Sequence, residues 1–490
     1  MTDTINDNHV ARKAGKGAFW VFLAYALSKV VVLLTTSILA RLLAKDDFGL
    51  VAVAVIAINY LSVIKDLGLG VALIQRRDNV DDAANTVFSI NVIVGFFLSI
   101  IVFPIAPFVA DYFNEPAVVS VIRWLGTSFA INALGSVHIV LLTRELDFRK
   151  KFIPDISNVI VKGVVSIGLA VTGFGVWALV FGQIAGSVVS VIAVWLIFPW
   201  RPKIMIKKTL ASAMLKFGAS VFGEDILSVF IENFDYIVVG RVFGLEQLSV
   251  YTLAFRLPEM LLIGILWVIA GITYPAFSTI QDKPDEMRRG MLFTTRFLQM
   301  FAMPISLGLL LAATPIVRVV FGDEWLEVIP VLRVLALYAW IYSVGFHVGD
   351  IYKAIGRPDI QLKLTIFTLI LIVPFITFGS KFGLVGVAWG HLSAALIYQS
   401  VSIIVAARFI NIPVTDILKE LKPSFQASSA MAPVVLATLF LTKNYSPYIQ
   451  LPLVVILGAF CYGVVLWGVE RENLLKMLRV VGVDIQKNEA

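Results

Sequence analysis

The feature that most constrains this chain is a series of long, predominantly apolar stretches separated by short polar segments. A helix needs about 20 mostly apolar residues to cross a bilayer. Of the 490 residues, 59% are hydrophobic and 15% charged, whereas soluble domains average about 45–50% and about 25%. Such a chain could not cover a soluble core with polar surface. The sequence predicts an all-α integral membrane protein and argues against soluble enzymes, disordered proteins and disulfide scaffolds.

The apolar stretches predict 14 transmembrane helices. The first stretch is too long for a signal-peptide core and has no small-residue cleavage site, so we interpret it as a retained span. The segments between the spans leave no room for a soluble domain. The expected spans are 17–40, 50–74, 86–110, 118–143, 155–173, 175–198, 215–240, 248–275, 291–318, 327–350, 362–380, 383–407, 424–442 and 449–469.

The distribution of basic residues predicts the orientation of these spans. With the N-terminus inside, the inner segments hold 28 of the 40 Lys and Arg residues and the outer segments hold six. Because cytoplasmic loops carry an excess of Lys and Arg, both termini are expected in the cytoplasm. The net charge of +7 therefore indicates orientation rather than nucleic-acid binding.

Three pairs of motifs indicate an internal repeat. The segment around Arg41, ILARLLAKDDFG, matches VVGRVFGLEQLS around Arg241, 200 residues later. PFVADYFNEP at 107 matches PIVRVVFGDE at 315, and FGVWALVFGQ at 174 matches FGLVGVAWGH at 382. The repeat predicts two six-helix bundles related by a parallel internal repeat, plus two C-terminal helices, an arrangement typical of transporters.

The predicted spans and the repeat together define the expected domains. The two bundles and the terminal helix pair are joined by cytoplasmic linkers and flanked by cytoplasmic tails, the last of which is amphipathic. The expected boundaries are 1–16 for the N-terminal tail, 17–200 and 215–408 for the bundles, 201–214 and 409–423 for the linkers, 424–469 for helices 13 and 14, and 470–490 for the C-terminal tail.

Motifs for catalysis and for cofactors are missing from the sequence. It contains no complete phosphate-binding loop, no GxSxG and no HExxH motif. Cys461 is the single cysteine, and the four histidines lack metal-ligand spacing, so they are expected to serve in packing. We therefore expect no enzyme activity, no metal site and no cofactor other than a coupling H⁺ or Na⁺.

Four basic residues within the predicted spans are candidates for substrate binding. A charge at the centre of a span costs about 2.5–3.5 kcal/mol on insertion scales, so such groups usually face a cavity. Lys29 lies halfway along the first span, and Lys65 precedes the sequence LGLG, whose glycines are expected to break the helix. A cationic cavity suits an anionic substrate such as a diphosphate. The candidates are Lys29, Lys65, Lys162 and Arg256. The alternatives are pairing of Lys29 with a neighbouring helix, snorkelling of Lys162, and pairing of Arg256 with Glu259 one turn away.

The span at 215–240 carries a stripe of acids. At 100° per residue, Glu224 and Asp235 lie within about 40° of arc, Glu232 lies about 80° from Glu224, and Asp225 flanks the stripe. Because neighbouring carboxylates in a low dielectric raise each other's pKa, they are suited to hold a coupling H⁺ or Na⁺. Salt bridges to Lys29, Lys65 or Arg256 are the alternative.

Several longer motifs resemble those of polysaccharide flippases in the multidrug/oligosaccharidyl-lipid/polysaccharide superfamily, the Wzx-type and colanic-acid-exporter-like proteins. They include DLGLGVALIQRRD at 66, FNEPAVVSVIRWLG at 113 and NFDYIVVGRVFG at 233. The resemblance implies a bacterial inner-membrane flippase for an undecaprenyl-diphosphate oligosaccharide. It further implies alternating access, gates formed by spans 1, 2, 7 and 8, and association with polymerase and export machinery for exopolysaccharide, capsule or O-antigen.

The sequence departs from the family pattern and leaves other functions open. Glu224 and Asp225 stand where the family usually has small polar residues, so coupling by these acids would be a local feature. The alternatives are a related flippase for peptidoglycan precursor or teichuronic acid, a cation-coupled drug exporter, and a non-transporting subunit of a glycan-synthesis complex.

Overall fold

The protein is an all-helical, multi-pass membrane protein. The computed structural model describes the backbone of residues 3–76 and 78–480, and the side chains of residues 20–65, 67–76, 78–216, 222–223, 225–271 and 273–471. Within these residues every regular element is a helix. Twelve helical stretches in this part of the chain are long and apolar enough to cross a membrane. The predicted all-α membrane fold is therefore confirmed.

The number of helical stretches differs from the fourteen predicted spans. Two of the twelve stretches are much longer than one membrane thickness, since Asp225–Thr279 has 55 residues and Pro358–Phe409 has 52. Each is interrupted, the first by a non-helical Gly244 and a π-helical turn, the second by a 3₁₀ turn at Ser380–Phe382. Tight turns between consecutive helices merge them into one stretch, and the count of fourteen stays a prediction.

The chain forms two compact units, Met1–Thr252 and Leu253–Ala490. These units follow from packing, whereas the expected domains follow from the repeat, so the domain boundaries stay a prediction. The first unit contains the helices α1 (Asp3–Leu42), α2 (Lys45–Asp66), α3 (Leu69–Gln75), α4 (Val80–Phe113), α5 (Val118–Arg144), α6 (Phe148–Val171), α7 (Val176–Ile197) and most of α8 (Lys208–Pro258).

The second unit begins in the last two turns of α8. A π-helix, η1 (Glu259–Ile263), leads into α9, and the remaining helices follow in sequence. They are α9 (Gly264–Thr279), α10 (Pro284–Leu311), α11 (Ala313–Val320), α12 (Val328–Gly345), α13 (Val348–Ala354), α14 (Pro358–Gly379), α15 (Gly383–Phe409), α16 (Val414–Leu441) and α17 (Pro447–Val480).

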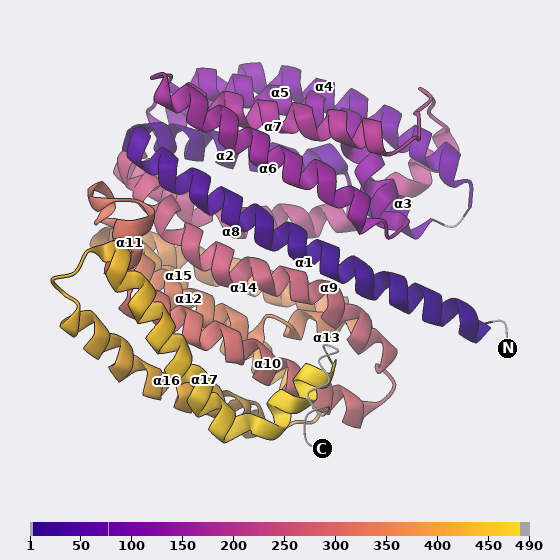
Figure 1. Ribbon diagram of the computed structural model, residues 1–490. Coiled ribbons are helices and arrows are strands. Elements are labelled where there is room, and N and C mark those ends of the chain that lie inside the picture. The colour runs from indigo at the N-terminus through magenta and orange to yellow at the C-terminus, as the bar shows by residue number, and fades with distance from the viewer. Residues whose placement is uncertain (1–2, 77, 481–490) are drawn as a thin grey trace. The chain divides into compact units, whose positions relative to one another are not determined.

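The same packing order occurs in both units. In the first, α4 packs on α5, α5 on α7, and α7 on α6. In the second, α10 packs on α12, α12 on α15, and α15 on α14. Figure 1 shows α4, α5 and α7 as neighbouring ribbons in the first unit, and α16 and α17 in yellow at the end of the second. This correspondence supports the internal repeat found in the sequence.

Positive φ angles also recur at aligned motif positions. Asn114 and Gly322, which match in the second motif pair, have φ angles of 56° and 102°. Gly175 and Gly383, which match in the third pair, have φ angles of 54° and 78°. Asn114 has the left-handed conformation that commonly ends a helix, whereas Gly322, Gly175 and Gly383 have ψ angles of 172°, −132° and −169°, which glycine adopts most readily. The repeated motifs therefore encode helix ends and turns as well as apolar faces.

The break that the glycines of LGLG predict within the second span is confirmed. Leu67 and Gly68 have φ angles of 44° and 67°, which separate α2 from the short helix α3. The Arg144 guanidinium, at the end of α5, donates to the carbonyls of Leu73 and Ile74 at 2.8 and 3.1 Å. Arg144 thus satisfies carbonyls that the end of α3 leaves without helical partners.

Candidate functional site

Among the acids of the predicted stripe whose side chains the structure describes, Asp235 is the buried one. Its side chain is 0% exposed, within the half of α8 that belongs to the first unit. Oδ2 accepts a hydrogen bond of 2.9 Å from the hydroxyl of Tyr251, and Oδ1 accepts one of 2.9 Å from the backbone N–H of Tyr236. An ionised carboxylate is stable in such a place only when hydrogen bonds or a cation compensate for lost hydration.

A kink in α8 brings Tyr251 back to Asp235. Gly244 has φ 82° and ψ −175°, which divides α8 into two helical parts. Only glycine adopts this conformation without strain, because a Cβ would clash with the backbone. Residues sixteen positions apart therefore meet through their side chains, an approach that a straight helix would not allow.

Helix α2 supplies the other side of this site. The Asn59 amide donates to Oδ1 of Asn233 at 3.3 Å, and the ring of Tyr60 lies edge-on to Phe230 at 6.4 Å between centroids. The hydroxyl of Tyr60 is buried without a hydrogen-bond partner and lies within electrostatic reach of Asp235. We refer to Asn59, Tyr60, Asn233, Asp235 and Tyr251 as the polar cluster.

The other predicted acids lie in different surroundings. Asp225 and Glu232 are exposed, and the side chain of Glu224 lies outside the described residues. No group of three or more His, Cys, Asp or Glu side chains suited to a metal occurs among the side chains that the structure describes. Asp235 therefore stands apart from its neighbours in burial, and its partners are hydroxyl and amide groups.

The four predicted cations are all half-buried, but their environments differ. The Lys29 ammonium lies 5.2 Å from the ring centroid of Tyr25, one turn earlier on α1. Lys65 lies in the last turn of α2, where the helix dipole favours a cation. The Lys162 ammonium donates to Oε1 of Gln183, which joins α6 to α7.

Arg256 is the cation with an unsatisfied polar atom. Its Nε is buried and makes no hydrogen bond, one turn before the π-helix η1. Lys29, Lys65 and Lys162 belong to the first unit and Arg256 to the second. Whether the four side chains face a common cavity stays a prediction.

The turns at the first pair of repeat motifs, which the predicted topology assigns to the outer side, contact each other within the first unit. The Lys45 ammonium forms an ion pair of 3.0 Å with Glu246, and the two side chains are 21% and 55% exposed. A Cβ added to Gly49 would lie 2.3 Å from the carbonyl oxygen of Leu245, so α2 and α8 approach closely there. We call the contacts of Lys45 and Gly49 with Leu245 and Glu246 the outer latch.

The sequence did not single out the uncharged members of the polar cluster. Asn59 and Tyr60 are adjacent polar residues that end the apolar run 50–58, and this interruption was the available signal. The expected packing role agrees with the structure for the histidines within the spans, whereas the side chain of His9 lies outside the described residues. His138, His347 and His391 are buried, with Nε2 of His138 3.2 Å from the carbonyl oxygen of Trp200 and Nε2 of His347 3.1 Å from the hydroxyl of Thr295.

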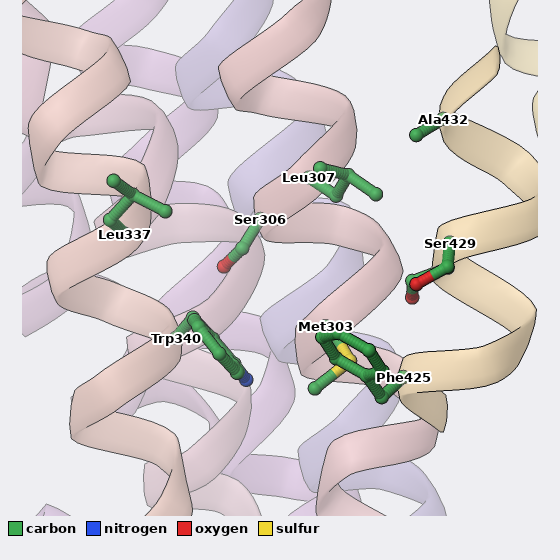
Figure 2. A pocket seen from close by; sticks show the side chains of 9 residues that line it. Met303, Ser306, Leu307, Leu337, Trp340, Phe425, Ser429 and Ala432 are labelled. Carbon is green, nitrogen blue, oxygen red and sulfur yellow. The ribbon is translucent and has the colours of Figure 1, made fainter. Parts of the chain in front are cut away.

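A separate cavity of about 190 Å³ lies between α10, α12 and α16 in the second unit. Figure 2 shows Ser306 of α10, Trp340 of α12 and Phe425 of α16 among its walls. No charged side chain lines the cavity, which therefore lacks the groups that would bind a diphosphate.

Comparison with known proteins gives consistent sequence matches. The model of the family described as polysaccharide biosynthesis protein matches residues 38–330. The chain is 26% identical to the lipopolysaccharide biosynthesis protein WzxC of Escherichia coli (strain K12) over 79% of each chain. It is 23% identical to the succinoglycan biosynthesis transport protein ExoT of Rhizobium meliloti (strain 1021), over 98% of this chain and 97% of that protein.

Solved structures share the fold at lower identity. The lipid II flippase MurJ in an inward closed conformation matches 92% of this chain and 99% of its own, with a TM-score of 0.73 and 17% identity. An inward-facing multidrug resistance MATE transporter matches 79% of this chain and 94% of its own, with a TM-score of 0.63 and 18% identity. The helix arrangement is thus similar to that of transporters in the MOP superfamily.

Proposed function

Because the chain belongs to the polysaccharide biosynthesis protein family, we propose that it flips a lipid-linked oligosaccharide across the bacterial cytoplasmic membrane. The substrate is an undecaprenyl-diphosphate oligosaccharide, which moves from the inner to the outer leaflet for export of exopolysaccharide, capsule or O-antigen. The role is transport by alternating access rather than catalysis. Polysaccharide polymerase and export machinery are the partners that would receive the product.

The observation that carries this proposal is the agreement among relatives that match most of the chain. ExoT is named a succinoglycan biosynthesis transport protein, and the teichuronic acid biosynthesis protein TuaB of Bacillus subtilis (strain 168) matches 96% of this chain at 23% identity. WzxC is named for lipopolysaccharide. The glycans differ, whereas a role in glycan biosynthesis is common to all three names, which supports a glycan as the substrate class here.

The proposed topology has fourteen passes with both termini in the cytoplasm. Two six-helix bundles at 17–200 and 215–408 are followed by a helix pair at 424–469, and the amphipathic tail from residue 470 lies on the inner leaflet. The kink at Glu470, where φ is −128°, supports a change of direction at that point. The bias of basic residues towards the inner segments supports this orientation.

The anionic part of the substrate would bind to Lys29, Lys65, Lys162 and Arg256. Each is half-buried in or near a predicted span. Arg256 has the strongest support, because its buried Nε has no hydrogen-bond partner and a diphosphate oxygen would supply one. Lys162 has the weakest support, because its ammonium already donates to Gln183.

The polar cluster would hold the coupling cation. Of the proposed residues Glu224, Asp225, Glu232 and Asp235, we place the primary role on Asp235, whose carboxylate is buried within electrostatic reach of the unpartnered hydroxyl of Tyr60. Carboxylate, hydroxyl and amide oxygens are hard ligands that suit Na⁺, and the carboxylate alone would suit H⁺.

The proposed function is tested by removing the protein from its native host. One undecaprenyl-diphosphate glycan should then accumulate on the inner leaflet, and the corresponding polymer should disappear from the surface. Expression of the wild-type chain should reverse both effects. Normal export with no accumulated lipid-linked glycan would contradict the proposal.

A further inference from the structure

Six aromatic rings of the second unit form a continuous series of contacts. Phe255 at the end of α8 and Trp267 of α9 lie at its two ends, and α12 and the turn after it supply three rings between them. Neighbouring ring centroids are 6.1 Å apart for Phe255–His391, 4.2 Å for His391–Tyr338, 5.9 Å for Tyr338–Tyr342, 5.6 Å for Tyr342–Phe346 and 5.3 Å for Phe346–Trp267. We call these six residues the aromatic ladder.

The ladder runs along the helix axes. Tyr338, Tyr342 and Phe346 follow one another at intervals of four residues, so they share one face of α12 and its extension. At a rise of 1.5 Å per residue they span about 12 Å, and the twelve residues from Phe255 to Trp267 span about 18 Å. The ladder therefore extends across roughly half of a hydrocarbon core of about 30 Å.

The rings are not sealed inside the protein. Trp267 is 58% exposed, and Phe255, Tyr342 and Phe346 are half-buried, whereas Tyr338 and His391 are 9% and 6% exposed. The ladder is thus buried at Tyr338 and His391 and becomes more accessible towards Trp267.

A second aromatic row in the same unit has a different setting. Phe293, Phe297 and Phe301 of α10 also follow at intervals of four, with centroids 6.4 and 5.2 Å apart. Phe297 packs against the core that α10 shares with α16 and α17. This row therefore serves as a matched comparison for the ladder.

Polar features accompany the ladder at the Phe255 end. Arg256, the next residue along the chain, has a buried Nε without a hydrogen-bond partner. The π-helix η1 begins at Glu259, and π-helical turns are frequent at functional sites. An anionic group of a substrate would accept a hydrogen bond from the Nε of Arg256. The part of the substrate next to that group would then lie on the aromatic faces.

We propose that the aromatic ladder binds the sugar rings of the substrate by stacking during translocation. The inference rests on the proposed function, because it takes the substrate to be a lipid-linked glycan. Pyranose rings have apolar C–H faces and polar edges, so they pack on aromatic faces while their hydroxyls stay hydrated. Successive rungs 4–6 Å apart offer a sugar ring a new partner at each step. Arg256 binds the adjacent phosphate or an acidic sugar.

The test compares two lipids with the full-length protein in nanodiscs. The probes are undecaprenyl diphosphate carrying an oligosaccharide from the native host and undecaprenyl diphosphate without sugar. Tyr342→Leu and Phe346→Leu should each weaken binding of the glycosylated lipid about tenfold. Both should leave binding of the sugar-free lipid unchanged, which also shows that the variants are folded. Tyr342→Phe, which keeps the ring, should bind both lipids as the wild type does.

Phe301→Leu, in the second aromatic row, is the matched control and should change neither affinity. The proposed role of the ladder is contradicted if the two Leu variants bind the glycosylated lipid as tightly as the wild type does. It is also contradicted if they weaken the binding of both lipids equally. Failure of the wild type to bind either lipid would overturn the proposed function together with the ladder.

Discussion

At the scale of single residues, Asp235 is the side chain whose burial most needs an explanation. Burying an ionised carboxylate costs several kcal/mol unless hydrogen bonds or a cation compensate. Tyr251 and the backbone N–H of Tyr236 supply two hydrogen bonds of 2.9 Å each. The unpartnered hydroxyl of Tyr60 lies near the same carboxylate. A bound cation would use both groups, which is why we place coupling here.

The two tyrosines of the polar cluster should respond differently to loss of their hydroxyls. Tyr251→Phe leaves a buried carboxylate oxygen without its donor and should destabilise the protein by about 1–3 kcal/mol. Tyr60→Phe removes a hydroxyl that has no partner and should leave the stability of the ion-free protein unchanged or slightly higher. Thermal unfolding of both variants in detergent measures the difference.

The same pair of variants tests the cation. If the Tyr60 hydroxyl is a ligand, added Na⁺ should raise the Tm of the wild type and raise that of Tyr60→Phe less. Asp235→Asn should abolish the shift, whereas Asp111→Asn, at an exposed position outside the proposed set, should retain it. A shift of equal size in wild type and Asp235→Asn would contradict a cation site at Asp235.

At the scale of elements, the kink in α8 positions the polar cluster. Gly244→Ala should destabilise the protein by about 1–2 kcal/mol, because Ala at φ 82° is strained although space surrounds its Cβ. Gly271→Ala is the control, since it lies in α9 with equally open space and should stabilise the helix by about 0.5–1 kcal/mol. Equal changes in Tm for the two variants would contradict a required kink.

The outer latch should control access from the outer side. An ion pair as exposed as Lys45–Glu246 contributes at most about 1 kcal/mol, which is enough to shift the populations of two conformations about fivefold. In a Cys461→Ser background with Ser62→Cys, Lys45→Glu should increase labelling by an impermeant maleimide from outside. Combining Lys45→Glu with Glu246→Lys exchanges the two charges and should restore the low rate of labelling. Unchanged labelling in the single variant would show that the latch is not a gate.

Elements were more predictable from the sequence than the contacts between them. Local hydropathy and glycine placement, which a single stretch of sequence contains, predict the span positions and the break at Leu67–Gly68. The repeat follows from comparing such stretches with one another. The pairing of Asn59 with Asn233 joins residues 174 positions apart, and no local pattern encodes it. The same holds for Arg296, which pairs with Glu420 and with Glu470 at the kink of α17.

At the scale of the whole molecule, the distribution of basic residues determines the proposed topology. Fourteen passes place both termini inside and the segment around Lys443 outside. A fluorescent protein at the C-terminus should therefore fluoresce, and alkaline phosphatase inserted after Lys443 should be active, whereas the phosphatase at the C-terminus should be inactive. An active phosphatase at the C-terminus would require an odd number of passes and contradict the proposal.

The central claim is that the chain moves a lipid-linked glycan between leaflets, and translocation by the purified protein tests it most directly. Proteoliposomes would carry undecaprenyl-diphosphate oligosaccharide from the native host, and a sugar-cleaving enzyme added outside would report the exposed fraction over time. Wild-type protein should make inner-leaflet lipid accessible, and Arg256→Ala should slow this about tenfold or more, because a buried phosphate would lose its charged donor. Exposure no faster than in protein-free vesicles, under imposed H⁺ and Na⁺ gradients of either direction, would contradict the account.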